Sequence, residues 1–192
     1  CNLFSTLLTA GSLYCERSFV PANFLDVLAK KEQVPTWYYA SPTFHHAIVQ
    51  HCEKVGIYEI THQLRFVRSG AANLVHSLAL KMKQLFKTTV LPTYSMTECM
   101  PIASVDLTYA LGKPGSVGHA IGPNLVILNS NQEKAKPNEV GEVNIYGPSV
   151  MLGYETPDGF SPLGEAWLAT GDLGYIDDDG FCLLYTSDAA DD

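Results

Sequence analysis

The sequence holds no concentration of positive charge. Its 12 lysine and arginine residues are outnumbered by 20 aspartate and glutamate residues, which gives a formal net charge of -8, and the basic residues form no run. Proteins that bind nucleic acid usually present a basic patch or stripe to the phosphate backbone. The composition therefore argues against nucleic acid as a main partner.

Paired cysteines and long apolar runs are also missing. The cysteines are odd in number, and no two of them have C-x-x-C spacing: Cys1, Cys15, Cys52, Cys99 and Cys182. This pattern argues against a zinc site and a disulfide framework, and it favours a reducing compartment. No apolar run reaches the roughly 20 residues that a transmembrane helix needs, so we expect no membrane span.

The two ends of the sequence are the parts that we expect to depart from a complete native chain. The chain begins with Cys1 rather than methionine, inside an apolar segment and without the pattern of a signal peptide. At the other end, the run from Cys182 to Asp191 resembles the translation of a sequencing-library adapter. We therefore expect the true N-terminus to lie upstream, native sequence to stop near Phe181, and residues 185–192 to be a non-native tail.

The remaining composition is typical of a globular protein. With 46% hydrophobic and 17% charged residues over 192 positions, the chain has room for one large domain or two small ones. Strand-like and helix-like segments alternate over residues 1–111, which is typical of a mostly parallel sheet covered by helices. We predict an α/β domain with this architecture over residues 1–111. It is followed by a smaller β-rich subdomain, antiparallel or barrel-like, over residues 112–184.

Local patterns predict the individual elements. An apolar helix is expected within residues 1–14, with a short strand near Leu13, and a second helix begins at Pro21 because proline suits the first turn. A third helix begins at Pro42, and Asn73 is expected to cap a fourth. The side chains expected to face the core from the last three helices are Phe24, Leu25, Leu28, Phe44, Ile48, Val49, Leu74, Leu78 and Met82. The predicted strands cover residues 36–40, 64–68, 88–94, 125–128, 142–146, 173–176 and 181–184.

One segment combines several groups that bind nucleotides. It contains Tyr94, Ser95, Met96, Thr97 and Glu98 and follows a predicted strand, and loops at the carboxyl edge of a parallel sheet bind ligands. Its aromatic ring can stack on a purine, its hydroxyls can donate to phosphate oxygens, and its carboxylate can hold Mg²⁺. Taken alone, however, an ordinary polar loop is the simpler interpretation.

Three further segments are weaker when each is taken alone. Gly70, Ala71 and Ala72 are small enough to let a flat ligand approach the backbone, although a plain strand-to-helix turn explains them as well. Asp172 can accept hydrogen bonds from a ribose diol or cap its own turn. Residues 141–154 form a strand that enters a glycine- and proline-containing turn, which is a structural pattern.

Together and in this order, these segments resemble the motifs of the adenylate-forming superfamily, which includes acyl-CoA synthetases, peptide-synthetase adenylation domains and firefly-type luciferases. Residues 94–98 resemble its Y-x-x-T-E motif, and residues 167–174 its W-x-x-T-G-D block. Residues 141–154 and the K-P-G-S-V-G stretch at residues 113–118 also match. Residues 36–47 and 113–118 look closest to ligases for small acids of the oxalyl type.

The resemblance implies a reaction and a role for each residue. It implies a carboxylic acid–CoA ligase that forms an acyl-adenylate from ATP and then a thioester with CoA. The alternatives are a peptide-synthetase adenylation domain and a catalytically silent nucleotide-binding module. For the adenine, the resemblance implies a pocket at Gly70, Ala71 and Ala72 and stacking by Tyr94, with Ser95 and Met96 beside it. For the rest of the nucleotide, it implies an α-phosphate contact at Thr97, Mg²⁺ binding at Glu98 and ribose binding at Asp172. His45 or His46 is a candidate for the acyl pocket, against the simpler interpretation of a surface histidine, while Met96 and Cys99 are expected to pack.

The resemblance also implies parts that the sequence does not contain. A phosphate-binding loop should precede residue 1, and a Gly-Arg pair and a mobile domain with a catalytic lysine should follow Leu184. We therefore expect the chain to be inactive by itself. In the intact parent we expect ATP or AMP, Mg²⁺, CoA and a small carboxylic acid as ligands, and a cytoplasmic or peroxisomal location.

Overall fold

The computed structural model describes residues 2–108 and 113–185, and the chain divides into two compact units. The first unit contains Cys1–Pro92 and Leu107–Pro114, and the second contains Thr93–Asp106 and Gly115–Asp192. Strand β3 (Thr89–Met96) passes from the first unit into the second. The predicted boundary at residue 111 and most of the predicted tail, residues 186–192, lie outside the described residues.

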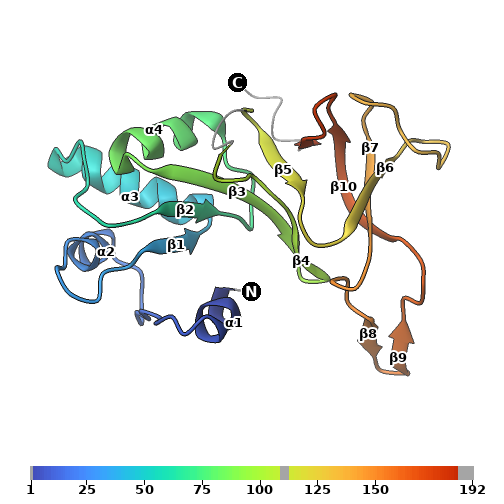
Figure 1. Ribbon diagram of the computed structural model, residues 1–192, viewed down its shortest axis with the longest axis horizontal. Helices are drawn as coiled ribbons and strands as arrows, with labels where there is room; N and C mark the ends of the chain where they lie inside the picture. The colour runs from blue at the N-terminus through green and yellow to red at the C-terminus, as the bar shows by residue number, and fades with distance from the viewer. Residues whose placement is uncertain (1, 109–112, 186–192) are drawn as a thin grey trace. The chain divides into compact units, whose positions relative to one another are not determined.

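The first unit is a parallel sheet with helices. Its helices are α1 (Asn2–Leu8), α2 (Pro21–Leu28), α3 (Pro42–Val55) and α4 (His76–Phe86). Strands β1 (Trp37–Ala40) and β2 (Phe66–Ser69) pair in parallel, and β2 pairs in parallel with the first half of β3. Figure 1 shows α3 and α4 along one face of these strands, which confirms the predicted α/β architecture for this part of the chain.

The core of the first unit lies between the helices and the sheet. Val67 of β2 and Val90 of β3 are fully buried and belong to the same cluster as Ile48 of α3 and Met82 of α4. A helix that presents apolar residues three or four positions apart buries one face in this way. The predicted inward-facing residues Leu28, Ile48, Val49, Leu74, Leu78 and Met82 are all buried, and Phe24 and Leu25 are partly buried against the same cluster.

Three local predictions for the first unit are wrong. Helix α4 begins at His76 with Val75 as its N-cap and no side-chain cap, so Asn73 is not the cap. Phe44 remains 42% exposed and packs edge-on against Phe19, with 4.8 Å between the ring centroids, rather than facing the sheet. No strand forms near Leu13. In each case, tertiary contacts outweigh the local preference of a short segment of sequence.

The second unit is antiparallel. Its sheet contains the end of β3, β4 (Cys99–Ser104), β5 (Ser116–Ala120), β11 (Cys182–Tyr185), β10 (Leu168–Ile176), β7 (Gly141–Tyr146) and β6 (Asn124–Leu128), in this order. A separate hairpin joins β8 (Gly153–Thr156) to β9 (Gly159–Pro162). Figure 1 shows this hairpin projecting beyond the strands of the sheet. The core of this unit is formed by Tyr94, Cys99, Ile102, Ala103, Ile127, Val143 and Ile145.

The predicted hairpin at the end of the chain forms as expected. Ile176 pairs with Cys182, and the carboxylate of Asp177 accepts hydrogen bonds from the N–H groups of Asp179 and Phe181. Gly180 has a φ of +86°, the left-handed conformation that glycine adopts without strain. This turn closes β10 onto β11 and thereby fixes the strand that carries Asp172.

A buried histidine in the first unit links its stability to pH. His45 of α3 is fully buried, and its Nδ1 lies 3.2 Å from the hydroxyl of Tyr38, while its Nε2 has no hydrogen-bond partner among the described residues. Burial lowers the pKa of His45 from 6.5 to about 4, opposed only in part by the nearby carbonyls of Ala40 and Arg68. Folding therefore favours a neutral imidazole at this position.

The pH dependence of unfolding follows from this shift. Because the folded-state pKa is depressed, the unfolded chain binds the proton first, so stability is complete above about pH 6.5 and decreases as the pH falls towards 4. We expect the loss between these values to be about 3 kcal/mol. Denaturant unfolding from pH 7.5 to 4.5 measures it, and His45→Gln should flatten the profile, whereas His46→Gln should not. Parallel profiles for His45→Gln and the parent protein would contradict this origin of the pH dependence.

Candidate functional site

The motif of residues 94–98 is a strand end and a hairpin turn rather than a free loop. Tyr94, Ser95 and Met96 complete β3, and Met96 pairs directly with Cys99 of β4, so Thr97 and Glu98 form the two-residue turn between the strands. The register shifts between Tyr94 and Met96: Ser95 of β3 lies opposite three residues of β4, 100–102, so the extra residues of this β-bulge belong to β4. The turn therefore holds Thr97 and Glu98 at a defined position.

Tyr94 is a core residue whose hydroxyl reaches a polar partner. Its side chain is only 7% exposed, and its hydroxyl donates a hydrogen bond of 2.5 Å to Oδ2 of Asp172. Burial raises the pKa of Tyr94 well above its usual value, and the Asp172 carboxylate raises it further. The hydroxyl therefore remains a donor throughout the physiological pH range. Because so little of the ring is exposed, the predicted stacking on adenine stays a prediction.

A second bulge positions Asp172. Strand β10 pairs with β7 through Ala169 and again through Leu173, and the register shifts between these two residues. Gly171 adopts a φ of +79° inside the bulge. The N–H of Asp172 donates to Oγ1 of Thr170 at 3.2 Å, and the Thr170 hydroxyl donates to the carbonyl of Val143 at 2.9 Å. This arrangement fixes the backbone of Asp172 and directs its carboxylate to the hydroxyl of Tyr94.

Glu98 is connected to the segment that follows β7. The hydroxyl of Tyr154 donates to Oε1 of Glu98 at 3.2 Å, and the carbonyl of Glu98 accepts the N–H of Met151 at 2.7 Å. Cys99 and Val150 form a bridge between the same two segments. The segment 141–154, which was interpreted as structural from the sequence, thus holds the Glu98 carboxylate of the hairpin turn.

The carboxylate of Glu98 fits the requirements of a magnesium ligand. Mg²⁺ is commonly bound through one or two carboxylates together with substrate phosphates, rather than by a cage of protein ligands. Among the described residues, no group of three or more histidine, cysteine, aspartate or glutamate side chains forms such a cage. Glu98 is half-buried, and within the described chain its Oε2 makes no hydrogen bond.

The small residues after β2 belong to the first unit. Ser69 pairs with Ala40 and Pro92, and the N–H of Gly70 donates to the carbonyl of Ala40 at 3.2 Å. Ala71 has a φ of +67°, a left-handed conformation that is uncommon for a residue with a β-carbon and that often marks a functional position. Ala71 and Ala72 are exposed.

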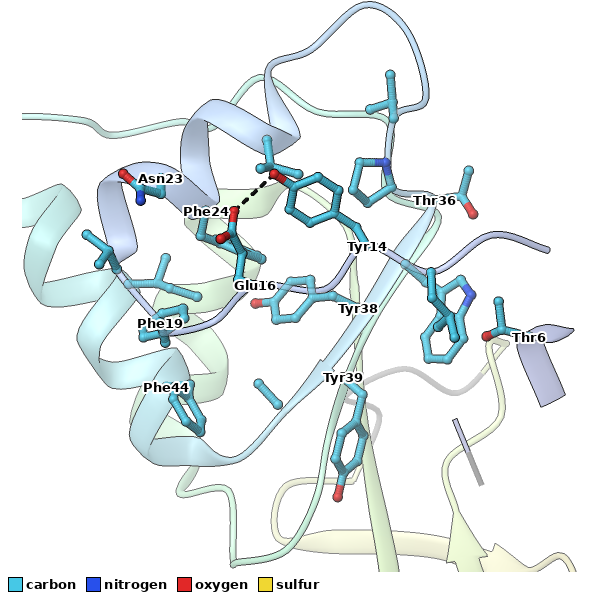
Figure 2. A pocket seen from close by; sticks show the side chains of 18 of the residues that line it. Thr6, Tyr14, Glu16, Phe19, Asn23, Phe24, Thr36, Tyr38, Tyr39 and Phe44 are labelled. Carbon is cyan, nitrogen blue, oxygen red and sulfur yellow. Dashed lines mark hydrogen bonds between the residues drawn. The ribbon is translucent and has the colours of Figure 1, made fainter. Parts of the chain in front are cut away.

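A cavity of about 1260 Å³, which was not predicted from the sequence, lies in the first unit. Figure 2 shows aromatic side chains gathered around it, among them Phe19, Phe24, Tyr38, Tyr39 and Phe44. Tyr14 and Glu16, joined by a hydrogen bond of 3.0 Å, and Ala71 also line the cavity. The signal that marks it is the density of aromatic residues between positions 14 and 44, which the sequence assigns to separate elements.

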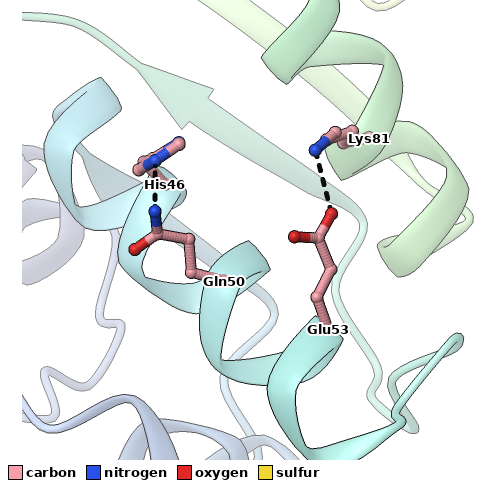
Figure 3. A network of polar contacts seen from close by, with 4 residues as sticks. All are labelled: His46, Gln50, Glu53 and Lys81. Carbon is pink, nitrogen blue, oxygen red and sulfur yellow. Dashed lines mark hydrogen bonds and ion pairs between the residues drawn. The ribbon is translucent and has the colours of Figure 1, made fainter.

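The two candidate histidines differ in their surroundings. His45 is buried and contacts Tyr38, which lines the cavity. His46 is exposed on α3, where its Nε2 lies 2.7 Å from the side-chain amide of Gln50. Figure 3 shows this pair beside a surface ion pair of 2.9 Å between Glu53 of α3 and Lys81 of α4. His46 thus belongs to the polar outer face of the helices.

The sequence-predicted packing residues behave as expected. Cys99 is 1% exposed and belongs to the core of the second unit, and Met96 packs against the same cluster. Burial raises the pKa of the Cys182 thiol to about 12, so this thiol also stays protonated and inert.

No helix among the described residues has both the length and the apolar character needed to cross a membrane.

Comparison with known proteins identifies the family. The model of one family, described as AMP-binding enzyme, matches residues 1–155. The chain belongs to the AMP-binding enzyme family. The adenylate-forming resemblance inferred from the motifs is thereby confirmed.

Individual relatives of this family member support the assignment. An oxalate–CoA ligase from Arabidopsis thaliana is 37% identical over 158 residues, which are 80% of this chain and 30% of that protein. An oxalate–CoA ligase from Saccharomyces cerevisiae is 34% identical over 188 residues, 95% of this chain and 33% of that protein. The chain thus spans about a third of the length of these relatives.

A solved structure supports the fold of this family member. O-succinylbenzoate coenzyme A synthetase from Bacillus subtilis, solved with ATP and a magnesium ion, superposes with a TM-score of 0.76 at 22% identity. The superposition covers 95% of this chain and 38% of that one. At this identity the similarity shows the fold, which agrees with the α/β class predicted from the sequence.

The bulge at Gly171 generates a stability prediction. An added β-carbon at Gly171 would meet nothing within 4 Å, so replacing this glycine tests its φ of +79° alone. We expect Gly171→Ala to lower the free energy of unfolding by about 1–2 kcal/mol, because left-handed backbone is unfavourable for alanine. Gly171→Asn should lose less, because asparagine tolerates this region. Denaturant unfolding measures both variants, and equal stability of Gly171→Ala and the parent would show that the bulge does not require this conformation.

Proposed function

We propose that the complete protein to which this chain belongs is an ATP-dependent, AMP-forming carboxylic acid–CoA ligase. In the first step an oxygen of the carboxylate attacks the α-phosphorus of ATP, the bond to the β-phosphate breaks, and pyrophosphate leaves. In the second step the thiolate of CoA attacks the acyl carbon, and AMP leaves as the thioester forms. The transition state of the first step gains negative charge on phosphate oxygens, so charge stabilisation and in-line positioning supply most of the catalysis.

The observation that carries this proposal is the contact between Tyr94 and Asp172. It holds a carboxylate next to a strand end whose following turn presents a hydroxyl at Thr97 and a second carboxylate at Glu98. A ribose diol, an α-phosphate and a phosphate-bound cation require these three kinds of group. The arrangement is built entirely within the second unit.

The residue roles in this proposal follow from these positions. Asp172 accepts hydrogen bonds from the ribose hydroxyls, Thr97 donates to the α-phosphate, and Glu98 holds Mg²⁺, which neutralises phosphate charge when it is bound. Gly70, Ala71 and Ala72 are candidates for contact with the adenine, and so are Tyr94, Ser95 and Met96. The left-handed conformation of Ala71 supports close approach of a planar base to the backbone.

The acid in this proposal is small. The relatives at 37% and 34% identity are both named oxalate–CoA ligases, so oxalate is the first acid to test. The cysteines of the described residues, Cys15, Cys52, Cys99 and Cys182, are all free, which supports a reducing location such as the cytoplasm or the peroxisome.

Two alternative functions make distinct predictions. A peptide-synthetase adenylation domain would be followed in the complete protein by a carrier domain, whereas a silent nucleotide-binding module would lack the lysine expected after this region. Purified complete protein, ATP, CoA and a panel of carboxylic acids test the main proposal. Formation of AMP and an acyl-CoA supports it, and formation of neither product with any acid contradicts it.

The first prediction concerns the metal site. Glu98→Gln keeps the shape of the side chain but removes its charge, so the Mg²⁺ site should weaken while the hairpin is retained. We expect the rate of acid-dependent pyrophosphate exchange to fall about 10- to 1,000-fold, the scale of losing one electrostatic stabiliser. Glu155→Gln, an exposed position on β8 beside Tyr154, is the matched control and should retain the parental rate. An unchanged rate in Glu98→Gln would refute the assigned role.

The second prediction concerns the ribose. Asp172→Ala removes a carboxylate that can take both ribose hydroxyls, and charge-assisted hydrogen bonds contribute roughly 1.5–3 kcal/mol each. We expect the KM for ATP to rise about 10- to 100-fold, with a much smaller change in the KM for the acid. Asp158→Ala, in the exposed turn between β8 and β9, serves as the control. A change confined to the KM for the acid would show that Asp172 acts on the acid rather than on the ribose of ATP.

A further inference from the structure

The side chain of Asp172 is exposed, yet it is held at one point. Its Oδ2 accepts the 2.5 Å hydrogen bond from Tyr94, and within the described part of the chain no hydrogen bond to Oδ1 is found. An exposed aspartate can rotate about its side-chain bonds, and ordering it on a ligand costs conformational entropy. A donor that fixes one oxygen before the ligand arrives removes part of this cost.

The donor that fixes Asp172 is itself rigid. Tyr94 is 7% exposed, lies in a strand and packs within the core of the second unit. Its pKa is raised by burial, so it holds its proton and donates at every physiological pH. A bond from a hydroxyl to an ionised carboxylate belongs to the stronger class of hydrogen bonds.

The backbone of Asp172 is held by contacts other than its hydrogen bond from Tyr94. The Gly171 bulge and the hydrogen bond from the Asp172 N–H to Thr170 determine where the α-carbon lies. The hydrogen bond from Tyr94 then determines where the carboxylate points. The two constraints act on different parts of the residue, so removal of the hydroxyl releases the carboxylate and leaves the bulge in place.

We propose that the hydroxyl of Tyr94 is a positioning group that presents the free oxygen of Asp172 to a ribose diol. The proposal rests on the proposed function, and it assigns to Tyr94 a contribution that is separate from stacking. Selectivity for ribonucleotides over nucleotides without ribose hydroxyls then depends on the hydroxyl of a core tyrosine that makes no contact with the sugar. The limited exposure of the ring favours this contribution over stacking.

The experiment compares two nucleotides on the same protein. The affinities of AMP and of 2′,3′-dideoxy-AMP are measured by calorimetry for the complete parent protein and for Tyr94→Phe, which keeps the ring and removes the hydroxyl. We expect Tyr94→Phe to weaken AMP binding about 3- to 10-fold, the scale of losing one net hydrogen bond. The affinity for 2′,3′-dideoxy-AMP should stay within about twofold, so the ratio of the two affinities falls.

Two further variants complete the test. Asp172→Asn should lower the same ratio, and adding Tyr94→Phe to it should lower the ratio no further, because the two changes act through one interaction. Tyr146→Phe is the matched control, since Tyr146 is a tyrosine of β7 that contacts Trp167 and lies outside the site. It should leave the ratio unchanged.

The outcomes separate the two proposals. A parent protein that binds no adenine nucleotide contradicts the proposed function and this inference with it. If the parent prefers AMP and Tyr94→Phe keeps the full preference, the positioning role alone is wrong. An equal loss for both nucleotides would show that Tyr94 acts through its ring or through folding, and it would also overturn the positioning role.

Discussion

The hydrogen bond between Tyr94 and Asp172 is the interaction on which the rest of the candidate site depends. It joins two residues that are 78 positions apart, one at the end of β3 and one in a bulge of β10. The partners are different in kind, because Tyr94 is buried in the core whereas Asp172 is exposed. Because the ring of Tyr94 is packed in the core, its hydroxyl restricts the movement of the exposed Asp172 carboxylate.

The bulges are the local features that make this contact possible. In a regular antiparallel strand, successive side chains point to opposite faces of the sheet, so only every second residue can face the site. Extra residues in one strand interrupt this regular pairing: residues 100–102 of β4 lie opposite Ser95 of β3, and residues 170–172 of β10 lie opposite Val143 of β7. The site therefore lies at two of the irregularities of the sheet, and Gly171 supplies the left-handed backbone that one of them contains.

The first unit provides a contrasting kind of polar burial. His45 is buried with one ring nitrogen near the hydroxyl of Tyr38, and among the described residues neither its other ring nitrogen nor the buried hydroxyl of Ser69 has a hydrogen-bond partner. Buried polar groups that lack partners reduce stability, and native structures contain few of them. Both residues flank the region where Tyr38 and Ala71 line the aromatic cavity. The first unit thus has buried polar groups without partners, among the described residues, close to its cavity.

The sequence by itself determined the residue types of the site and the class of fold. Periodic apolar residues fixed α2, α3 and the inner face of α4, and the four motif segments in their order fixed the family. Tertiary structure decided the rest. It turned the expected loop at residues 94–98 into a hairpin, started α4 at His76, and paired the hydroxyl of Tyr94 with Asp172. Strand register and bulges depend on partners far along the chain, and a one-residue shift moves every side chain to the opposite face, so local sequence could not specify these contacts.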